Sequence, residues 1–208
     1  MKTIQHLIIL LAATFVLPAT AQTLRTGLLA GGSLGLINNL EPRSNVFHGN
    51  GQPVQYAYDY QYGLSLGYRF RIENERNDRL FYDLDAWLNG KVFESETLYL
   101  GDYNGYRVKA ISHDVSLALA VSPSVNYKLI QDLYVGFGVE PTWYMVPTTD
   151  GKKFDIPCVW TLGYDINPKI DITLTYRLGF TNVIDDKFFK KGNISDISLS
   201  IFIPFTVK

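Results

Sequence analysis

Several charged residues lie in segments where polar and apolar residues alternate. Their types and spacing could support chemistry. Asp83 and Asp85 lie two residues apart, so in an extended strand both carboxylates project from one face, as an acid and base pair would require. Inside an enclosed space such charges must pair, because an unpaired, desolvated charge costs several kcal/mol. We therefore interpret five residues as an interior network of salt bridges at broadly similar heights, with a gated path for ions or protons as the alternative: Arg69, Asp83, Asp85, Glu140 and Arg177.

His113 is a second residue that could take part in a reaction, as a base that activates a hydroxyl. Its neighbours Ser112 and Asp114 project from the opposite face of an extended strand, and the residue two positions further on is Val115. The spacing therefore favours a passive histidine over lipid hydrolysis. Cys158 is the single cysteine, which excludes a disulfide and paired-cysteine metal sites. We expect no catalytic residues, no metal and no cofactor.

Alternation over residues 56–73 indicates the element that must position these side chains. Nine apolar or aromatic residues at even positions alternate with nine small or polar residues at odd positions. Successive side chains of a β-strand point to opposite faces, so the pattern predicts one long strand with an apolar and a polar face. Globular sheets typically have strands of about 5 to 6 residues, whereas a tilted strand that crosses a bilayer needs about 9 to 11.

The same alternation recurs along the chain and predicts eight strands, at residues 24–37, 56–73, 80–99, 106–127, 133–145, 154–166, 170–180 and 197–207. Short connections, such as residues 167–169, contrast with long ones at residues 38–55 and 184–193. Small bacterial membrane barrels have an even number of strands, with short turns at one end and longer loops at the other. The predicted fold is all-β, an eight-stranded antiparallel transmembrane up-and-down β-barrel, with a bulge at Pro123.

The composition of the two faces predicts which one is outside. Glycines gather on the polar face, as a narrow interior requires. Aromatic residues on the apolar face suit the membrane–water boundary: Tyr56, Tyr58, Tyr60, Tyr68, Phe70, Trp143 and Trp160. A secreted soluble barrel, with its apolar face turned inward, is the alternative.

The start of the chain has the pattern of an export signal. Lys2 precedes an apolar run, and Ala19-Thr20-Ala21 is a small-x-small cleavage site. Residues 1–21 are therefore expected to be a cleaved signal peptide and residues 22–208 a single outer-membrane barrel domain. The formal net charge is −1 without a basic cluster, so no nucleic-acid partner is expected.

With this signal, eight alternating strands and a regular last strand (Ile197, Leu199, Ile201, Ile203, Phe205), the chain resembles a known family. It is similar to the small outer-membrane β-barrel proteins of Gram-negative bacteria, the PorT-like and OmpA-OmpX-like barrels, and most of all to the PorT-like barrels of Bacteroidota. The likeness is one of pattern over the whole mature chain. Many relatives end on an aromatic residue, whereas here Thr-Val-Lys follows Phe205.

The resemblance implies location in the bacterial outer membrane and a non-enzymatic structural or interaction protein. Such a protein would act through its outer loops or as a small subunit of an envelope complex. The implied partners are outer-membrane lipid, lipopolysaccharide and a larger envelope protein complex. Three alternatives stay open: an accessory factor of a secretion or nutrient-uptake machine, a narrow ion channel, and a lipid-modifying outer-membrane enzyme.

Overall fold

The fold is described by a computed structural model over residues 22–43, 54–74, 77–103, 106–147, 149–185 and 188–207. The expected signal peptide, residues 1–21, lies outside these ranges. Within them, no helix has both the length and the apolar character needed to cross a membrane.

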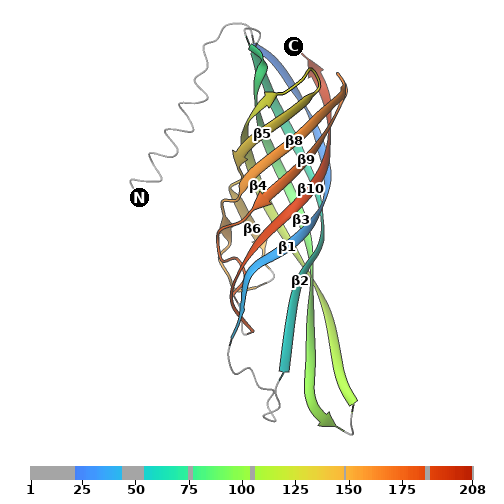
Figure 1. The fold of residues 1–208 in the computed structure, drawn as a ribbon, viewed down its shortest axis with the longest axis vertical. Coiled ribbons are helices and arrows are strands. Elements are labelled where there is room, and N and C mark those ends of the chain that lie inside the picture. Colours follow the sequence, from blue (N-terminus) through green and yellow to red (C-terminus); the bar gives the residue numbers. More distant parts are fainter. Residues whose placement is uncertain are drawn as a thin grey trace, which may run out of the picture.

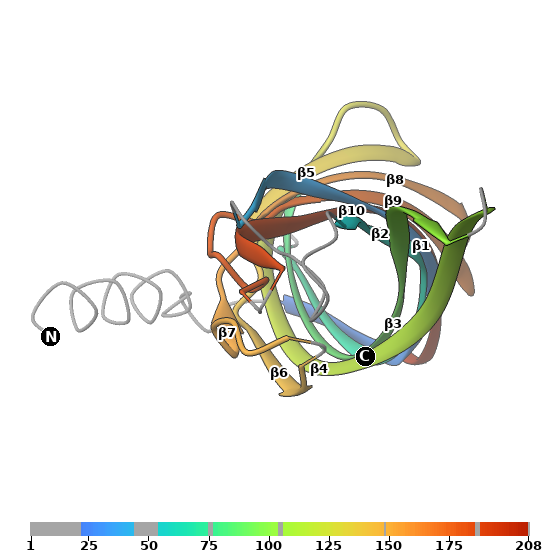
Figure 2. The ribbon, with the colours of Figure 1, turned by 90° about the horizontal axis from the view of Figure 1, so that it is seen from below.

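One antiparallel sheet closes on itself to form a barrel (Figures 1 and 2). Its segments are β1 (Gln22–Pro42), β2 (Val54–Asn74), β3 (Asn77–Tyr103), β4 (Tyr106–Lys128), β5 (Leu133–Val139), β6 (Thr142–Val146), β7 (Phe154–Asp155), β8 (Cys158–Asn167), β9 (Ile170–Leu178) and β10 (Phe189–Val207). Around the ring the order is β3-β2-β1-β10-β9-β8-β5-β4, and β3 pairs with β4 to close it. The predicted eight-stranded up-and-down barrel is confirmed.

Prolines interrupt two positions in this wall. β5 and β6 are one strand broken at Glu140 and Pro141, and β7 and β8 are one strand broken just before Cys158. The bulge predicted at Pro123 is wrong, because Pro123 faces Leu84 in an unbroken register. Proline lacks an N–H, and at this position the missing N–H lies on the side of β5 and β6, so the pairing of β4 with β3 is unaffected.

Apolar side chains cover the outside of the barrel. Leu34, Leu64 and Leu66 are 68, 69 and 67 % exposed. Leu88, Leu119, Val121, Phe137, Leu162, Leu174, Leu199 and Ile201 are exposed in the same way. Hydrocarbon can cover a surface of this extent, and the closed ladder satisfies the backbone where water is absent. The barrel is therefore of the membrane-spanning kind, and we call this surface the apolar belt.

A register shift in β2 reverses its two faces. The pairing of β2 with β3 shifts between Tyr60 and Tyr62, so that Gln61 is an extra residue. Even-numbered residues face outward after the shift, as Leu64 does, but inward before it. Tyr58 and Tyr60 are 4 and 5 % exposed, so their prediction as membrane-interface aromatics is wrong. A bulge inserts one residue and thereby exchanges the faces of the strand.

Three neighbouring strands, β2, β3 and β4, extend beyond the rest of the barrel at the end opposite the β8–β9 turn (Figure 1). Figure 1 shows β2, β3 and β4 continuing past the other strands at its lower end. We call residues 54–62, 92–103 and 106–116 of these strands the projecting sheet. The base of the projecting sheet, with Tyr58, Tyr60 and Phe93, still packs against other buried side chains of the barrel. We call the end with the projecting sheet the loop side, and the other end the turn side.

Several strand ends differ from the prediction. β1 continues to Pro42, and β10 begins at Phe189, well before the predicted residue 197. The two strands pair through Asn38↔Asn193 and Glu41↔Lys191, so much of the expected charged loop 184–193 is part of the wall. Its polar side chains pair across the strands, which a search for apolar alternation does not detect.

Candidate functional site

Arg71 of β2 is the centre of an ion-pair network in the turn-side half of the interior. Its side chain is fully buried. Nε and Nη2 donate to the two carboxylate oxygens of Asp83 at 2.8 and 2.9 Å, and Nη1 donates to Oδ2 of Asp171 at 2.6 Å. The guanidinium also lies 4.4 Å from the centroid of the Phe81 ring. Such bidentate, charge-assisted bonds and ring contacts suit a delocalised arginine.

Arg69 precedes Arg71 by two residues on β2, so its side chain also points inward, and it extends this network. Its Nε and Nη2 donate to the carboxylate of Asp85 at 2.7 and 2.8 Å. Its Nη1 lies 3.6 Å from Asp83, which joins the two arginines through one carboxylate. Tyr134 contributes a hydroxyl that donates to Asp171. We call Arg69, Arg71, Asp83, Asp85, Asp171 and Tyr134 the turn-side network.

A small apolar cluster, which we call the apolar layer, lies between this network and a second one. Leu29, Trp87, Ala120 and Phe202 form a buried cluster. On β3 the inward residues run from Asp85 through Trp87 to Lys91, so the layers can be followed along one strand. On β9 and β10 the buried residues between the two networks are small and polar, namely Thr173, Thr175, Ser198 and Ser200, so the apolar side chains fill part of the cross-section.

The second network joins four charged residues on the loop side of that layer. Lys91 Nζ donates to Asp196 Oδ2 at 2.8 Å. Arg177 donates to Glu140 Oε2 at 2.8 Å and to Asp196 Oδ1 at 3.0 Å. Lys91, Arg177, Glu140 and Asp196, which we call the loop-side network, carry two positive and two negative charges when ionised. Each charge has an opposite partner, as a low-dielectric interior requires.

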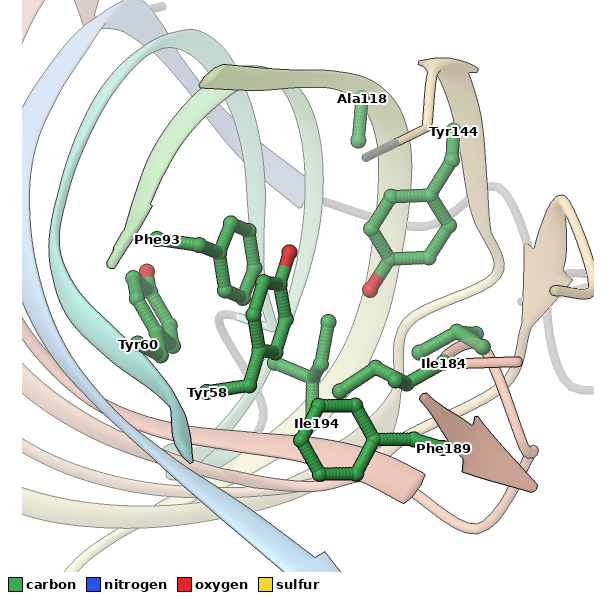
Figure 3. Close-up of a cluster of buried hydrophobic side chains, with 9 residues drawn as sticks. Tyr58, Tyr60, Phe93, Ala118, Tyr144, Ile184, Phe189 and Ile194 are labelled. Carbon is green, nitrogen blue, oxygen red and sulfur yellow. The ribbon is translucent and has the colours of Figure 1, made fainter. Parts of the chain in front are cut away.

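Aromatic and aliphatic side chains fill the loop-side mouth of the barrel (Figure 3). This mouth cluster contains Tyr58, Tyr60, Phe93, Ala118, Tyr144, Val183, Ile184, Phe189 and Ile194, all buried. Tyr58 and Phe93 stack with ring centroids 5.4 Å apart, and the Tyr60 hydroxyl lies 2.6 Å from Ser33 Oγ. Val183 and Ile184 belong to the connection between β9 and β10, which packs into the mouth. The wall and this connection together close the interior on the loop side.

The structure places all five predicted interior residues inside the barrel, but at two levels. Arg69, Asp83 and Asp85 belong to the turn-side network, while Glu140 and Arg177 belong to the loop-side network. The expectation of similar heights is therefore wrong, because the strands tilt and a count from each turn does not give the level. Sequence reasoning missed five members or neighbours of these networks as site residues: Arg71, Lys91, Asp165, Asp171 and Asp196. All but Asp196 lie on polar faces of predicted strands. This position is the signal by which sequence reasoning could have found them.

A hollow of about 570 Å³ opens at the turn side, next to the turn-side network. Arg25, Glu73, Lys128 and Asp165 line it. Arg25 lies 3.6 Å from Glu73 and 3.8 Å from Asp165, so the charges that line the hollow form ion pairs with one another. Among the described residues, no group of three or more His, Cys, Asp and Glu could hold a metal ion.

The outward face of the projecting sheet is charged, unlike the apolar belt. Lys109 Nζ lies 2.8 Å from Glu96, and His113 Nε2 lies 3.3 Å from Glu94. Asp59 faces outward next to Glu94 on the neighbouring strand. His113 is 61 % exposed at its side chain, paired across the strand with an acid. A charged outward face does not fit hydrocarbon, so this sheet stands beyond the membrane-spanning part.

The remaining predicted interface aromatics differ in where they point. Phe70, Trp143 and Trp160 are exposed on the outside of the barrel, at 42, 54 and 41 %. Tyr68 lies beside Phe70, with ring centroids 5.0 Å apart. Tyr56 belongs to the projecting sheet, stacks on Phe188 at 3.7 Å and packs against the mouth cluster, so its prediction as a membrane-interface aromatic is wrong.

Comparison with known proteins gives structural likenesses alone. No protein-family model and no curated protein matches the chain. The outer membrane protein OprG from Pseudomonas aeruginosa is 12 % identical, with a TM-score of 0.45 over 88 % of this chain and 92 % of that one. The translocator domain of the autotransporter NalP from Neisseria meningitidis is 7 % identical, with a TM-score of 0.32 over 98 and 95 %. The transport unit of the autotransporter AIDA-I from Escherichia coli is 9 % identical, with a TM-score of 0.31 over 96 and 97 %.

These values transfer neither an activity nor a partner to this chain. The barrel assignment rests instead on its own strand ladders, which close through the pairing of β3 with β4 and of β1 with β10.

Proposed function

We propose that this chain is a bacterial outer-membrane barrel that binds another protein at the cell surface through its projecting sheet, without enzymatic activity. The projecting sheet carries this proposal. Three paired strands continue beyond the apolar belt, and their outward face adds charged residues, including Glu94, Glu96 and Lys109, to apolar ones such as Ile111 and Val115. Bacterial barrels keep short turns in the periplasm and longer connections outside, which puts the projecting sheet on the cell surface. Rigid barrels commonly present recognition surfaces in this way.

The interior supports a scaffold better than a channel. Phe93 and Phe202 have no exposed surface, and Arg71 has none either. The two networks, the apolar layer and the mouth cluster lie in succession along the barrel. In a planar bilayer the purified protein is expected to carry no steady current, and sustained single-channel steps would support the channel alternative instead.

Site-directed photo-crosslinking on intact cells tests the binding function. A photoreactive amino acid at His113 lies on the projecting sheet, and one at Leu199 on the apolar belt serves as the control. We expect a discrete protein adduct from position 113 that position 199 does not give.

A truncated variant makes the test specific to the projecting sheet. Replacing residues 95–112 by Asn-Gly places a two-residue hairpin turn on the Glu94↔His113 pair and leaves the barrel wall intact. The adduct from position 113 is expected to disappear. An adduct that survives truncation, or equal labelling from both positions, would reject the proposal.

A further inference from the structure

The outer half of β4 has a neighbour on one side only. On one edge, β4 pairs with β3 as far as Tyr99↔Val108 and Tyr103↔Tyr106. On the other edge, its pairing with β6 ends at Leu117↔Val146, where Ser116 Oγ donates to the Val146 carbonyl at 2.8 Å. In the part of the chain that the structure describes, no strand pairs with that edge of β4 over residues 108–116. We call this the free edge of β4.

Odd-numbered residues direct their backbone groups to the free edge. The Val121 N–H donates to the Pro141 carbonyl on the side of β5 and β6. The Tyr144 N–H donates to the Lys153 carbonyl on the far side of β6. The backbone N–H and C=O of the preceding residue, Trp143, therefore point towards its partner Leu119 on β4. The register of β4 against β3 is unbroken from Leu80↔Tyr127 to Tyr99↔Val108, so the alternation holds to the tip. Lys109, Ile111, His113 and Val115 therefore present their N–H and C=O groups outward along the free edge.

The free edge lacks the features that usually protect an edge strand. Residues 108–116 contain no proline, and no register shift falls among them in the pairing with β3. Lys109 and His113 direct their side chains towards Glu96 and Glu94 of β3 and not across the free edge. An unprotected edge of this length is a template for strand addition.

The corresponding edge of β2 also has no paired strand over residues 54–62 within the described residues, but other side chains of the protein pack beside it. Its pairing with β1 ends at Ser33↔Gly63, beyond which Tyr60 packs against Gly35 and bonds Ser33. Tyr56 stacks on Phe188. Because this packing lies beside β2, the edge of β4 is the more accessible of the two edges of the projecting sheet within the described residues.

We infer that an extended segment of another protein adds to β4 as an antiparallel strand opposite residues 108–116; this rests on the proposed binding function. A second copy fits less well. In one membrane every copy of β4 runs from its tip towards the bilayer, so two copies could pair only in parallel, which is less stable per residue. A separate segment can take the opposite direction. Its outward side chains would meet Ile111 and Val115, which are 52 and 57 % exposed, so apolar or β-branched residues fit there.

A proline at position 111 tests this inference without breaking the projecting sheet. Ile111→Pro removes one N–H from the free edge, whereas the bonds of β4 to β3 come from even-numbered residues and remain. Ile111→Ala keeps the N–H and removes most of the side chain. The probe is a phage-displayed library of random extended peptides, selected against the mature protein in lipid nanodiscs. Far-ultraviolet circular dichroism checks that both variants keep the fold.

Selected peptides are expected to bind Ile111→Pro at least about tenfold more weakly than the wild type, as a lost hydrogen bond and a steric clash require, and to bind Ile111→Ala within a few-fold. Bound peptide should slow amide exchange at Lys109, Ile111, His113 and Val115, while Ala110, Ser112 and Asp114 stay unchanged. Failure to recover any peptide that prefers the wild type to Ile111→Pro overturns strand addition. If the adduct from position 113 still depends on residues 95–112 in that case, the proposed function stands and the strand-addition mechanism alone fails. Concentration-dependent dimers lost in Ile111→Pro would show that the occupant is a second copy and would also overturn the inference.

Discussion

Arg71 and Asp171 bond across the barrel interior, with Nη1 and Oδ2 2.6 Å apart, although β1 and β10 separate their strands in the wall. This pair links two strands that are three places apart in the ring. It shows that the interior charges hold the wall together in addition to filling space.

Removing the guanidinium of Arg71 should destabilise the barrel strongly. Arg71→Met keeps much of the side-chain volume but leaves Asp83 and Asp171 buried without their main partner. The free energy of unfolding, measured by urea titration in lipid vesicles, is expected to fall by about 3 to 5 kcal/mol. Lys109→Met breaks the exposed pair with Glu96 and is expected to cost about 0 to 1 kcal/mol. Equal losses in the two variants would contradict a stabilising role for the turn-side network.

Gly163 of β8 should be intolerant of even a methyl group. A Cβ at this position would overlap the ring of Tyr134 and push its hydroxyl away from Asp171. We expect Gly163→Ala to lower the unfolding free energy by about 1 to 3 kcal/mol, the usual range for overpacking. Gly90→Ala is the control, because its Cβ would meet its nearest neighbours at 3.7 Å, an ordinary contact. A loss at position 163 no larger than that at position 90 would argue against close packing around Tyr134.

The height of the apolar belt can be measured with one charge at two positions. Ile201 and Ile111 are similarly exposed, at 43 and 52 %, but Ile201 lies in the belt and Ile111 on the projecting sheet. Ile201→Arg is expected to lose about 2 to 4 kcal/mol of unfolding free energy in vesicles if it lies near the midplane, and Ile111→Arg about 0 to 1. A comparable loss at position 111 would place the projecting sheet in the bilayer and remove the basis for the binding proposal.

The reversal of faces at Gln61 can be tested with single cysteines in a Cys158→Ser background. On the N-terminal side of the register shift in β2, Asp59 is exposed whereas Tyr58 is buried in the mouth cluster. A charged maleimide added to cells should label Asp59→Cys readily and Tyr58→Cys slowly. Cys substitution at Gln55, which is exposed on the same face as Asp59, serves as a positive control. Fast labelling at position 58 together with slow labelling at position 59 would mean that the alternation continues unbroken through Gln61.

Alternation in the sequence was sufficient to predict the eight strands, the apolar outer face and the inward direction of Asp83, Asp85 and Arg177. It failed at Tyr58 and Tyr60, because a bulge exchanges the faces without changing the pattern of residue types. It also could not pair Arg71 with Asp171. Which residues meet across the interior depends on strand tilt and stagger around the whole ring, and these are not encoded locally. The free edge of β4 follows from the unequal lengths of β4 and β6, which were predicted only approximately.

The pairing of β1 with β10 also governs how the protein can assemble. When β5 with β6 and β7 with β8 are each counted as one strand, every other ladder joins strands that follow one another along the chain. This ladder joins the two ends of the barrel, from Arg25↔Val207 to Pro42↔Phe189. Contacts between distant parts of a chain form slowly, and unpaired strand edges invite aggregation until they are closed. The barrel therefore cannot close until β10 is present and pairs with β1. A chain truncated before Phe189 would leave the edges of β1 and β9 unpaired in hydrocarbon. Pairing of the last strand is therefore the step that makes the barrel stable in the membrane.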